Sequence, residues 1–283
     1  MTPSESFKGD FFKSIWEHTL KMLRYSLPIG IAYFAVTMAF ILGIITRILD
    51  VDLELYLAIA QNPLENQAEL EAFSQNLAEQ FLANWPILLI IFLVMFLFQA
   101  YIYAILVKTS QDVLHGKNPT LKDMFSNTDL RTVLNIFLAS ISIVLIYSSL
   151  AFFAMMLSSI HALLSVAMFL FIILFLMRFI AFLPGIVLGK LGVIDSLRYS
   201  LMRVTWNRAA KLILISFALG VAFLIALMVI STITMFLGSV GNGINFLLNI
   251  AIQIFMLAGI SALYTGLHYR YIYEDEAPNV EEE

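Results

Sequence analysis

The sequence of 283 residues contains no cysteine and few charged side chains. Without a thiol, the chain can form neither a disulfide framework nor a thiolate metal site. Only 13% of its residues are charged, whereas soluble domains contain about 25%. The chain is 61% hydrophobic and its mean hydropathy is +0.90, which excludes an intrinsically disordered protein. The composition therefore predicts a protein that folds in a membrane.

The few charges leave four long uncharged runs in the chain. These runs contain 22, 28, 46 and 58 residues, over 25–46, 80–107, 132–177 and 212–269. A helix needs about 20 apolar residues to cross a hydrocarbon core of about 30 Å. The first two runs therefore accommodate one span each, and the last two accommodate two spans each. The runs do not alternate as the strands of a membrane barrel would, so the predicted fold class is all-α, a polytopic membrane protein with six transmembrane helices.

The expected bounds of the spans follow from turn residues and charges. The first two spans are predicted over 27–46 and 86–107. The next two are separated by a turn at Ser158–His161, and the last two by a turn at Gly238–Gly243. We expect a cytoplasmic amphipathic segment over 1–26, a single transmembrane domain over 27–270 and an acidic cytoplasmic tail over 271–283. The first span lacks a cleavage site after it, so we expect it to remain as an uncleaved anchor.

Basic residues are distributed unequally along the predicted topology. Fourteen of the 16 Lys and Arg residues precede the first span, follow spans two and four, or follow the sixth span. The positive-inside rule places these segments and both termini in the cytoplasm. The opposite loop over 50–85 contains seven acidic residues. A further helix is predicted to begin there at Asn62-Pro63.

Three cytoplasmic segments have helical patterns next to spans. They are Phe7–Leu23, a helix start at Asn118–Asp123 with the proline just inside the helix, and Val193–Thr205. Their basic residues lie off the apolar face. This pattern predicts helices at the membrane interface, and the alternative is linker helices packed under the bundle. The expected apolar face of the first segment comprises Phe7, Phe11, Ile15, Trp16, Leu20 and Leu23. That of the third comprises Ile194, Leu197, Leu201 and Val204.

Two groups of polar residues inside spans are candidate sites. Arg178 is the one charge well inside a span, and a lipid phosphate or a backbone carbonyl is its expected partner. Span six contains a stripe of polar residues on one helix face, formed by Asn242, Asn245, Asn249, Gln253, Ser261, Tyr264 and His268. The stripe serves either as hydrogen-bonding contact between helices or as the lining of a cavity. Its expected partners are Gln99 in span two and Asn135, Ser142 and Ser149 in span three.

Catalytic motifs are absent from the sequence. The histidines His18, His115, His161 and His268 are scattered and show no spacing of metal ligands. No phosphate-binding loop or nucleophile elbow occurs, and no cofactor is expected. The basic residues lie next to spans and suit lipid headgroups, so we expect no nucleic acid partner.

A stretch after span four has a family resemblance. The stretch consists of Pro184-Gly185-Ile186-Val187 and the segment from Leu191 to Trp206. Its pattern is a proline near the inner end of span four, followed by a cytoplasmic helix with a serine and with a basic residue and a tryptophan at its end; the positions are Pro184, Ser200, Arg203 and Trp206. The stretch resembles the six-span bacterial inner-membrane proteins of the YciC type, and is similar to the membrane domain of some glycerophosphodiester phosphodiesterases. The resemblance implies a bacterial inner membrane. The catalytic barrel of the phosphodiesterases is missing from this chain.

Three functions remain open at this point. The first is a non-enzymatic membrane protein that binds or organises lipids, partner membrane proteins or further copies of itself. Its candidate binding residues are Arg178, Arg198, Arg203, Gln99, Asn245, Asn249 and Gln253. The second is a transporter or channel for a small polar or amphiphilic solute, with the stripe of span six along its path. The third is a lipid-modifying enzyme that uses His115 and His268.

Overall fold

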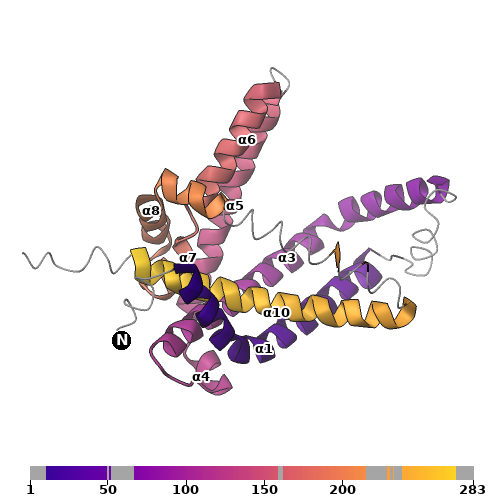
Figure 1. Cartoon of the computed structure of the whole chain (residues 1–283). Coiled ribbons are helices and arrows are strands. Elements are labelled where there is room, and N and C mark those ends of the chain that lie inside the picture. Colours follow the sequence, from indigo (N-terminus) through magenta and orange to yellow (C-terminus); the bar gives the residue numbers. More distant parts are fainter. Residues whose placement is uncertain are drawn as a thin grey trace, which may run out of the picture. The chain divides into compact units, whose positions relative to one another are not determined.

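The structure is a computed structural model, and it describes residues 11–49, 51, 67–158, 162–214, 228–229, 232 and 238–271. These residues form helices joined by short connections, with no strand among them. The helices are α1 (Phe11–Gly43), the π-helix η2 (Ile44–Ile48), α3 (Gln67–Leu114), α4 (Leu121–Ser126), α5 (Leu130–Ser158), α6 (Ala162–Met177), α7 (Phe182–Val187), α8 (Val193–Arg203) and α10 (Gly238–Tyr271). The prediction of an all-α protein is confirmed (Figure 1).

Within the described residues, five helical segments are long and apolar enough to cross a membrane. They are Lys13–Ile48, Gln67–Leu114, Leu130–Leu157, Leu163–Val187 and Gly243–Tyr269. These segments contain the predicted spans one to four and the sixth span. The predicted fifth span lies almost wholly outside the described residues. These five helical segments are compatible with an integral membrane protein.

Three predicted helix boundaries are wrong. α1 runs without a break through Pro28, so the amphipathic segment and the first span form one helix. α3 runs through Pro86 for 48 residues, so the predicted helix of the 50–85 loop and the second span are continuous. Proline is tolerated inside such long apolar helices because neighbouring groups satisfy the freed carbonyl. The predicted turn at Gly238–Gly243 is instead the beginning of α10.

The chain divides into two compact units. The smaller unit comprises Ile31–Gln99, and contains the second half of α1 and the first part of α3. These two segments run antiparallel in that unit. The ring of Tyr33 stacks on that of Phe98 at 5.8 Å between centroids, and the Asn84 side-chain amide donates to the carbonyl of Ile48 at 3.1 Å.

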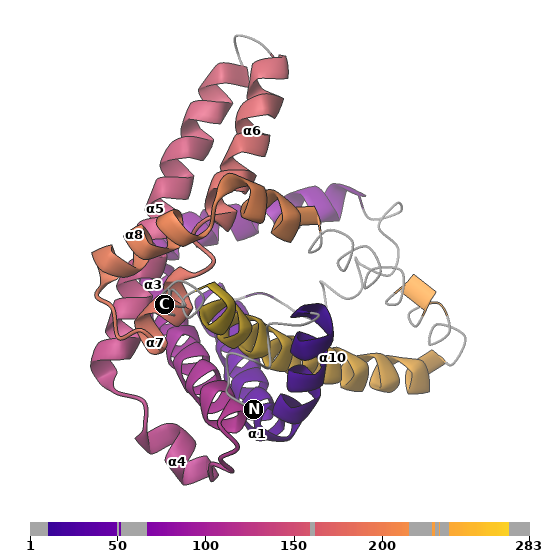
Figure 2. The ribbon, with the colours of Figure 1, turned by 60° about the vertical axis from the view of Figure 1, so that its left-hand side comes forward.

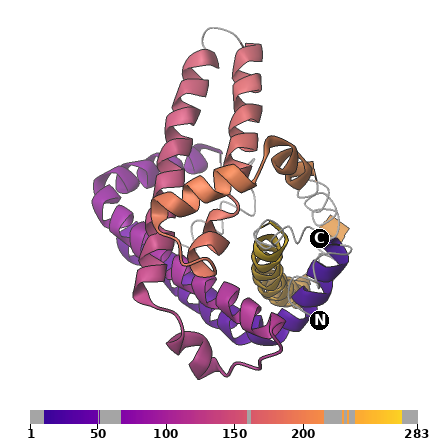
Figure 3. The ribbon, with the colours of Figure 1, turned by 90° about the vertical axis from the view of Figure 1, so that its left-hand side faces the viewer.

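The larger unit comprises 1–30 and 100–283, and contains the hairpin of α5 and α6. These helices lie side by side in all three views (Figures 1, 2 and 3). Ala139 of α5 and Ile172 of α6 are buried, whereas Phe152, Leu163 and Phe169 are exposed. A hairpin with apolar side chains outward is stable in lipid and costly in water.

The core of the larger unit lies where α1, α3, α7 and α10 approach one another. Ile105, Ile186 and Leu267 are buried there. The first half of α1 and α10 pack closely, since a Cβ atom added to Gly30 would lie 2.6 Å from Cγ1 of Ile254. The N-terminal end of α1 contributes Phe11 to a cluster with Leu267 and Tyr269. This end of α1 is therefore packed against protein along one side, while Trp16 and Leu20 of the predicted apolar face are exposed.

Candidate functional site

Arg178 binds the C-terminal end of α8. Its Nε donates to the carbonyl of Val204 at 2.9 Å, and its Nη2 donates to the carbonyl of Leu201. Its guanidinium also lies over the ring of Trp206, 4.6 Å from the centroid. The last carbonyls of a helix lack partners within the helix and hold partial negative charge. A backbone carbonyl is one of the two partners expected for Arg178, and two such carbonyls are the partners observed.

Ser200 connects the same region of α8 to the chain before α7. The Ser200 hydroxyl donates to the carbonyl of Arg178 at 2.6 Å and accepts from the backbone N–H of Ala181 at 2.9 Å. Ser200 is fully buried. A serine at this position lets the backbones approach closely and satisfies two buried backbone groups. α8 lies at the end of the hairpin where α5 begins and α6 ends (Figures 2 and 3).

The four residues on which the predicted family resemblance rests lie around this contact. Ser200 and Trp206 both touch Arg178, and Pro184 is buried in α7. Arg203 lies on the same turn of α8, with its guanidinium 5.9 Å from the ring centroid of Tyr199, and its carbonyl accepts from Arg208. Ser200 and Trp206 thus hold α8 and the residues after it against the segment 178–181, which precedes α7.

The outer face of α8 has another composition. Ile194, Arg198 and Met202 recur at four-residue spacing, and all three are exposed. Of the predicted apolar face, Val204 is buried, Leu197 and Leu201 are half-buried, and Ile194 is 79% exposed. The helix is therefore rotated from the predicted orientation, because Ser196 and Ser200 take the position closest to the protein.

The polar stripe of span six has two halves in α10. Asn245 is half-buried, Asn249 and Gln253 are exposed, and the Asn249 amide donates to the carbonyl of Asn245 in the same helix. Asn242 has no described side chain. The second half, with Ser261 and His268, is buried.

Two of the expected partners of the stripe form bonds within their own helix. Ser142 and Ser149 each donate to a carbonyl four residues earlier in α5. Asn135 is half-buried in α5. Gln99 is half-buried in α3 and belongs to the smaller unit.

A buried hydrogen-bond chain joins α1, α3 and α10 instead. The Thr265 hydroxyl donates to Oγ of Ser110 at 2.7 Å, and Ser110 Oγ lies 2.8 Å from Nε2 of His18. All three residues are buried. Sequence reasoning missed this chain, although Thr265 lies four residues after Ser261 on the polar face of α10. It shows that the buried end of α10, next to the stripe, makes hydrogen-bonding contact with two other helices.

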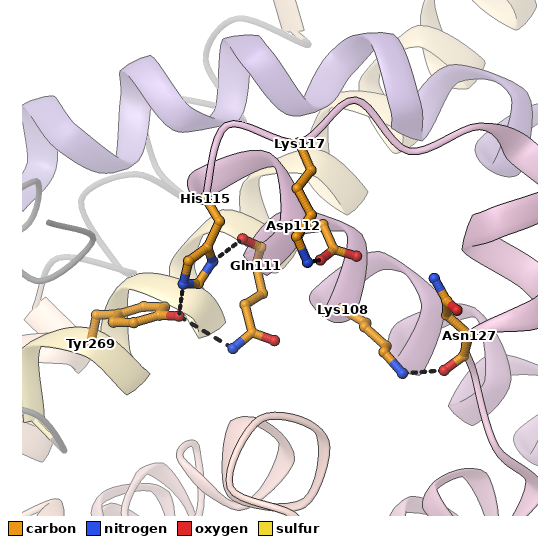
Figure 4. A network of polar contacts seen from close by, with 7 residues as sticks. All are labelled: Lys108, Gln111, Asp112, His115, Lys117, Asn127 and Tyr269. Carbon is orange, nitrogen blue, oxygen red and sulfur yellow. Dashed lines mark hydrogen bonds and ion pairs between the residues drawn. The ribbon is translucent and has the colours of Figure 1, made fainter. Parts of the chain in front are cut away.

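His115 and His268 both pack against Tyr269. Their ring centroids lie 5.9 and 5.4 Å from that of Tyr269. His115 Nδ1 donates to the carbonyl of Gln111, which leaves Nε2 to accept from the Tyr269 hydroxyl at 3.4 Å. The Gln111 amide donates to the same hydroxyl at 3.2 Å (Figure 4). His115 is exposed whereas His268 is buried, so the two imidazoles do not face one accessible space.

The chain turns sharply after α3. Lys117 N–H donates to the carbonyl of Asp112 at 2.9 Å, and Gly116 N–H donates to that of Val113 at 3.0 Å. This pair of bonds is a Schellman motif, in which Gly116 has a φ of +75° that glycine adopts without strain. The Lys117 ammonium then pairs with the Asp112 carboxylate at 2.8 Å (Figure 4).

α4 begins directly after this turn. Thr120 is its N-cap, and Thr120 and Asp123 form a capping box. The predicted helix start is confirmed, but Pro119 precedes the cap and does not lie inside the helix. Hydrogen bonds from the Thr120 side chain and backbone lower the pKa of Asp123. Hydrogen bonds from Thr132 lower the pKa of Asp129 in the same way at the start of α5.

Metal ligands and known relatives give no further assignment. In the part of the chain that the structure describes, no three His, Asp or Glu side chains converge to hold a metal ion. Comparisons of the chain with protein-family models, with curated proteins and with solved structures found no match.

Proposed function

We propose that this protein is a non-enzymatic integral membrane protein that binds phospholipid at one membrane surface. The supporting observation is the placement of α8. This helix is fixed by Arg178 and Ser200 at one end of an apolar, membrane-length hairpin. Its outer face has exposed Ile194 and Met202 on either side of Arg198. Apolar side chains that flank a basic one suit the boundary between acyl chains and phosphates.

The proposal also covers the orientation of the chain and the identity of the membrane. The basic residues before the first predicted span, and those after the second and the fourth, favour both termini in the cytoplasm. The resemblance to the YciC type favours a bacterial inner membrane.

Single labelled cysteines test the position of α8, because the chain has no native cysteine. The full chain with Ile194→Cys or Met202→Cys is labelled with an environment-sensitive fluorophore and reconstituted into phospholipid vesicles. We expect quenching by nitroxide lipids and protection from aqueous iodide at both positions. Leu163→Cys, in the exposed part of α6, is the positive control for lipid contact. Iodide quenching at 194 and 202, without quenching by nitroxide lipids, would overturn the proposal.

The two alternative functions have less support. A transporter requires a water-filled path along Asn245, Asn249 and Gln253, and labelling of cysteines at these positions by membrane-impermeant reagents tests that prediction. An enzyme that uses His115 and His268 requires both imidazoles at one substrate, whereas only one of them is exposed.

A further inference from the structure

A groove of about 420 Å³ lies between α1 and the turn after α3, away from α8. Its cationic lining consists of Lys21 and Arg24 from α1 and Lys117 from the turn. Leu20 and Tyr25 complete the side formed by α1. No acidic residue lines the groove. All of these residues belong to the larger unit.

The fold brings these three cations together by a specific route. Lys21 and Arg24 are three residues apart and so share a face of α1. The Schellman motif at Gly116 reverses the chain after α3. The Tyr25 hydroxyl then donates to Oδ1 of Asn118 at 3.0 Å, which holds the turn against α1. Lys117 is thereby placed opposite the basic face of α1.

The protein balances only one of the three positive charges of the groove. Among the described residues, no acidic side chain forms an ion pair with Lys21 or Arg24. The Arg24 guanidinium lies 5.6 Å from the ring centroid of Tyr25, and this contact leaves its charge intact. Lys117 has one ion pair, with Asp112, and its side chain is 68% exposed. The charges of Lys21 and Arg24 repel each other and the Lys117 charge, which the Asp112 carboxylate offsets in part, and a bound anion removes that repulsion.

The chemistry favours a phosphate. Lysine and arginine donate charge-assisted hydrogen bonds to phosphate oxygens. The uncharged run of α1 begins directly after Arg24, and exposed Leu27 lies one turn further along the same helix. A phosphate in the groove would therefore have apolar side chains beside it, as a phospholipid requires. We propose that Lys21, Arg24 and Lys117 bind the phosphate group of a phospholipid headgroup, which rests on the proposed membrane integration.

The test uses the full chain in nanodiscs of phosphatidylcholine, titrated with short-chain phosphatidylglycerol in one arm and with glycerol 3-phosphate in the other. The variant is Lys21→Gln with Arg24→Gln, which removes two charges and leaves shorter, polar side chains in their place. The matched control is Lys122→Gln with Arg131→Gln, two exposed cations of the predicted cytoplasmic side that do not line the groove. Thermal unfolding followed by tryptophan fluorescence verifies that both variants are folded.

We expect the groove variant to weaken binding at least about tenfold and the control less than about twofold, since each lost charge-assisted hydrogen bond contributes on the order of 1.5 kcal/mol. A loss in the lipid arm alone assigns the phosphate to a lipid, and a loss in both arms assigns it to soluble phosphoesters. Equal losses in the groove variant and the control, or no loss in either, would overturn the assignment. In that case, lipid contact of the labels on α8 would leave the proposed function standing.

Discussion

Replacement of Arg178 tests how α8 is held. Arg178→Ala removes the donors to the carbonyls of Leu201 and Val204 and the stacking on Trp206. Arg178→Lys keeps the positive charge but cannot reach both carbonyls with one planar group. The two variants therefore separate the charge of the side chain from its forked geometry.

The expected magnitude follows from these contacts. Hydrogen bonds that involve a charged group contribute about 1.5–3 kcal/mol each, and a cation–π contact contributes about 0.5–2 kcal/mol. The lower ends of these ranges add to about 3.5 kcal/mol, and solvent screens part of this energy because Arg178 is half-buried. We expect undocking of α8 to become about 2.8 kcal/mol easier in Arg178→Ala and about 1.4 kcal/mol easier in Arg178→Lys.

Hydrogen exchange of the α8 amides in nanodiscs measures this difference. An 11-residue helix is not stable alone in water, so its amides exchange when it undocks. The expected acceleration is about 100-fold for alanine and about tenfold for lysine. Lys211→Ala, an exposed cation outside α8, is the matched control and should leave the rates nearly unchanged. Identical exchange in Arg178→Ala and the wild type would refute the role assigned to Arg178.

Three other outcomes follow from single contacts. Ser200→Ala should destabilise α8 docking by about 1–3 kcal/mol, because it leaves the Arg178 carbonyl and the Ala181 N–H without their partner. Ser196→Ala is the control, because it removes a bond within α8 alone. Hydrogen exchange of the α8 amides compares the two variants, and equal acceleration in both would contradict the role of Ser200. Asp112→Asn should tighten phosphate binding about two- to fivefold, because it releases Lys117 from its ion pair. The lipid titration in nanodiscs measures this affinity, and weaker binding by the variant would contradict a phosphate site in the groove. Protonation of Asp123 should loosen α4. The pKa of Asp123 is lowered in the folded state, so the capping box stabilises α4 fully above the ordinary aspartate pKa of about 4, and this stabilisation is lost as the pH falls through the lower folded pKa. Hydrogen exchange of the α4 amides, corrected for intrinsic rates, should show this loss of protection in acid for the wild type and not for Thr120→Ala.

Much of the helical architecture could be predicted from the sequence. Charges are costly in hydrocarbon, so the distances between them set the expected spans over 27–46 and 86–107. The same rule could not locate helix ends, because helices continue beyond the membrane when their polar turns remain solvated. α3 therefore includes the acidic residues Glu69 and Glu79, as well as Pro86.

The site was only partly predictable. The isolation of Arg178 in an apolar run indicated that it needed a partner, but the identity of the carbonyls depends on how α8 folds back. The groove was out of reach, because Lys21 and Lys117 are far apart in the sequence and meet through the turn at Gly116. A glycine that follows a predicted span is the one local signal of that turn.

Native mass spectrometry of the full chain, released from nanodiscs that contain phosphatidylglycerol and phosphatidylethanolamine, tests the central claim most directly. The account predicts phospholipid adducts that persist at collision energies which remove the bulk lipid. It also predicts fewer adducts in the Lys21→Gln, Arg24→Gln variant than in the Lys122→Gln, Arg131→Gln control. A spectrum of lipid-free protein for the wild type under the mildest conditions of release would contradict the claim that this protein binds phospholipid.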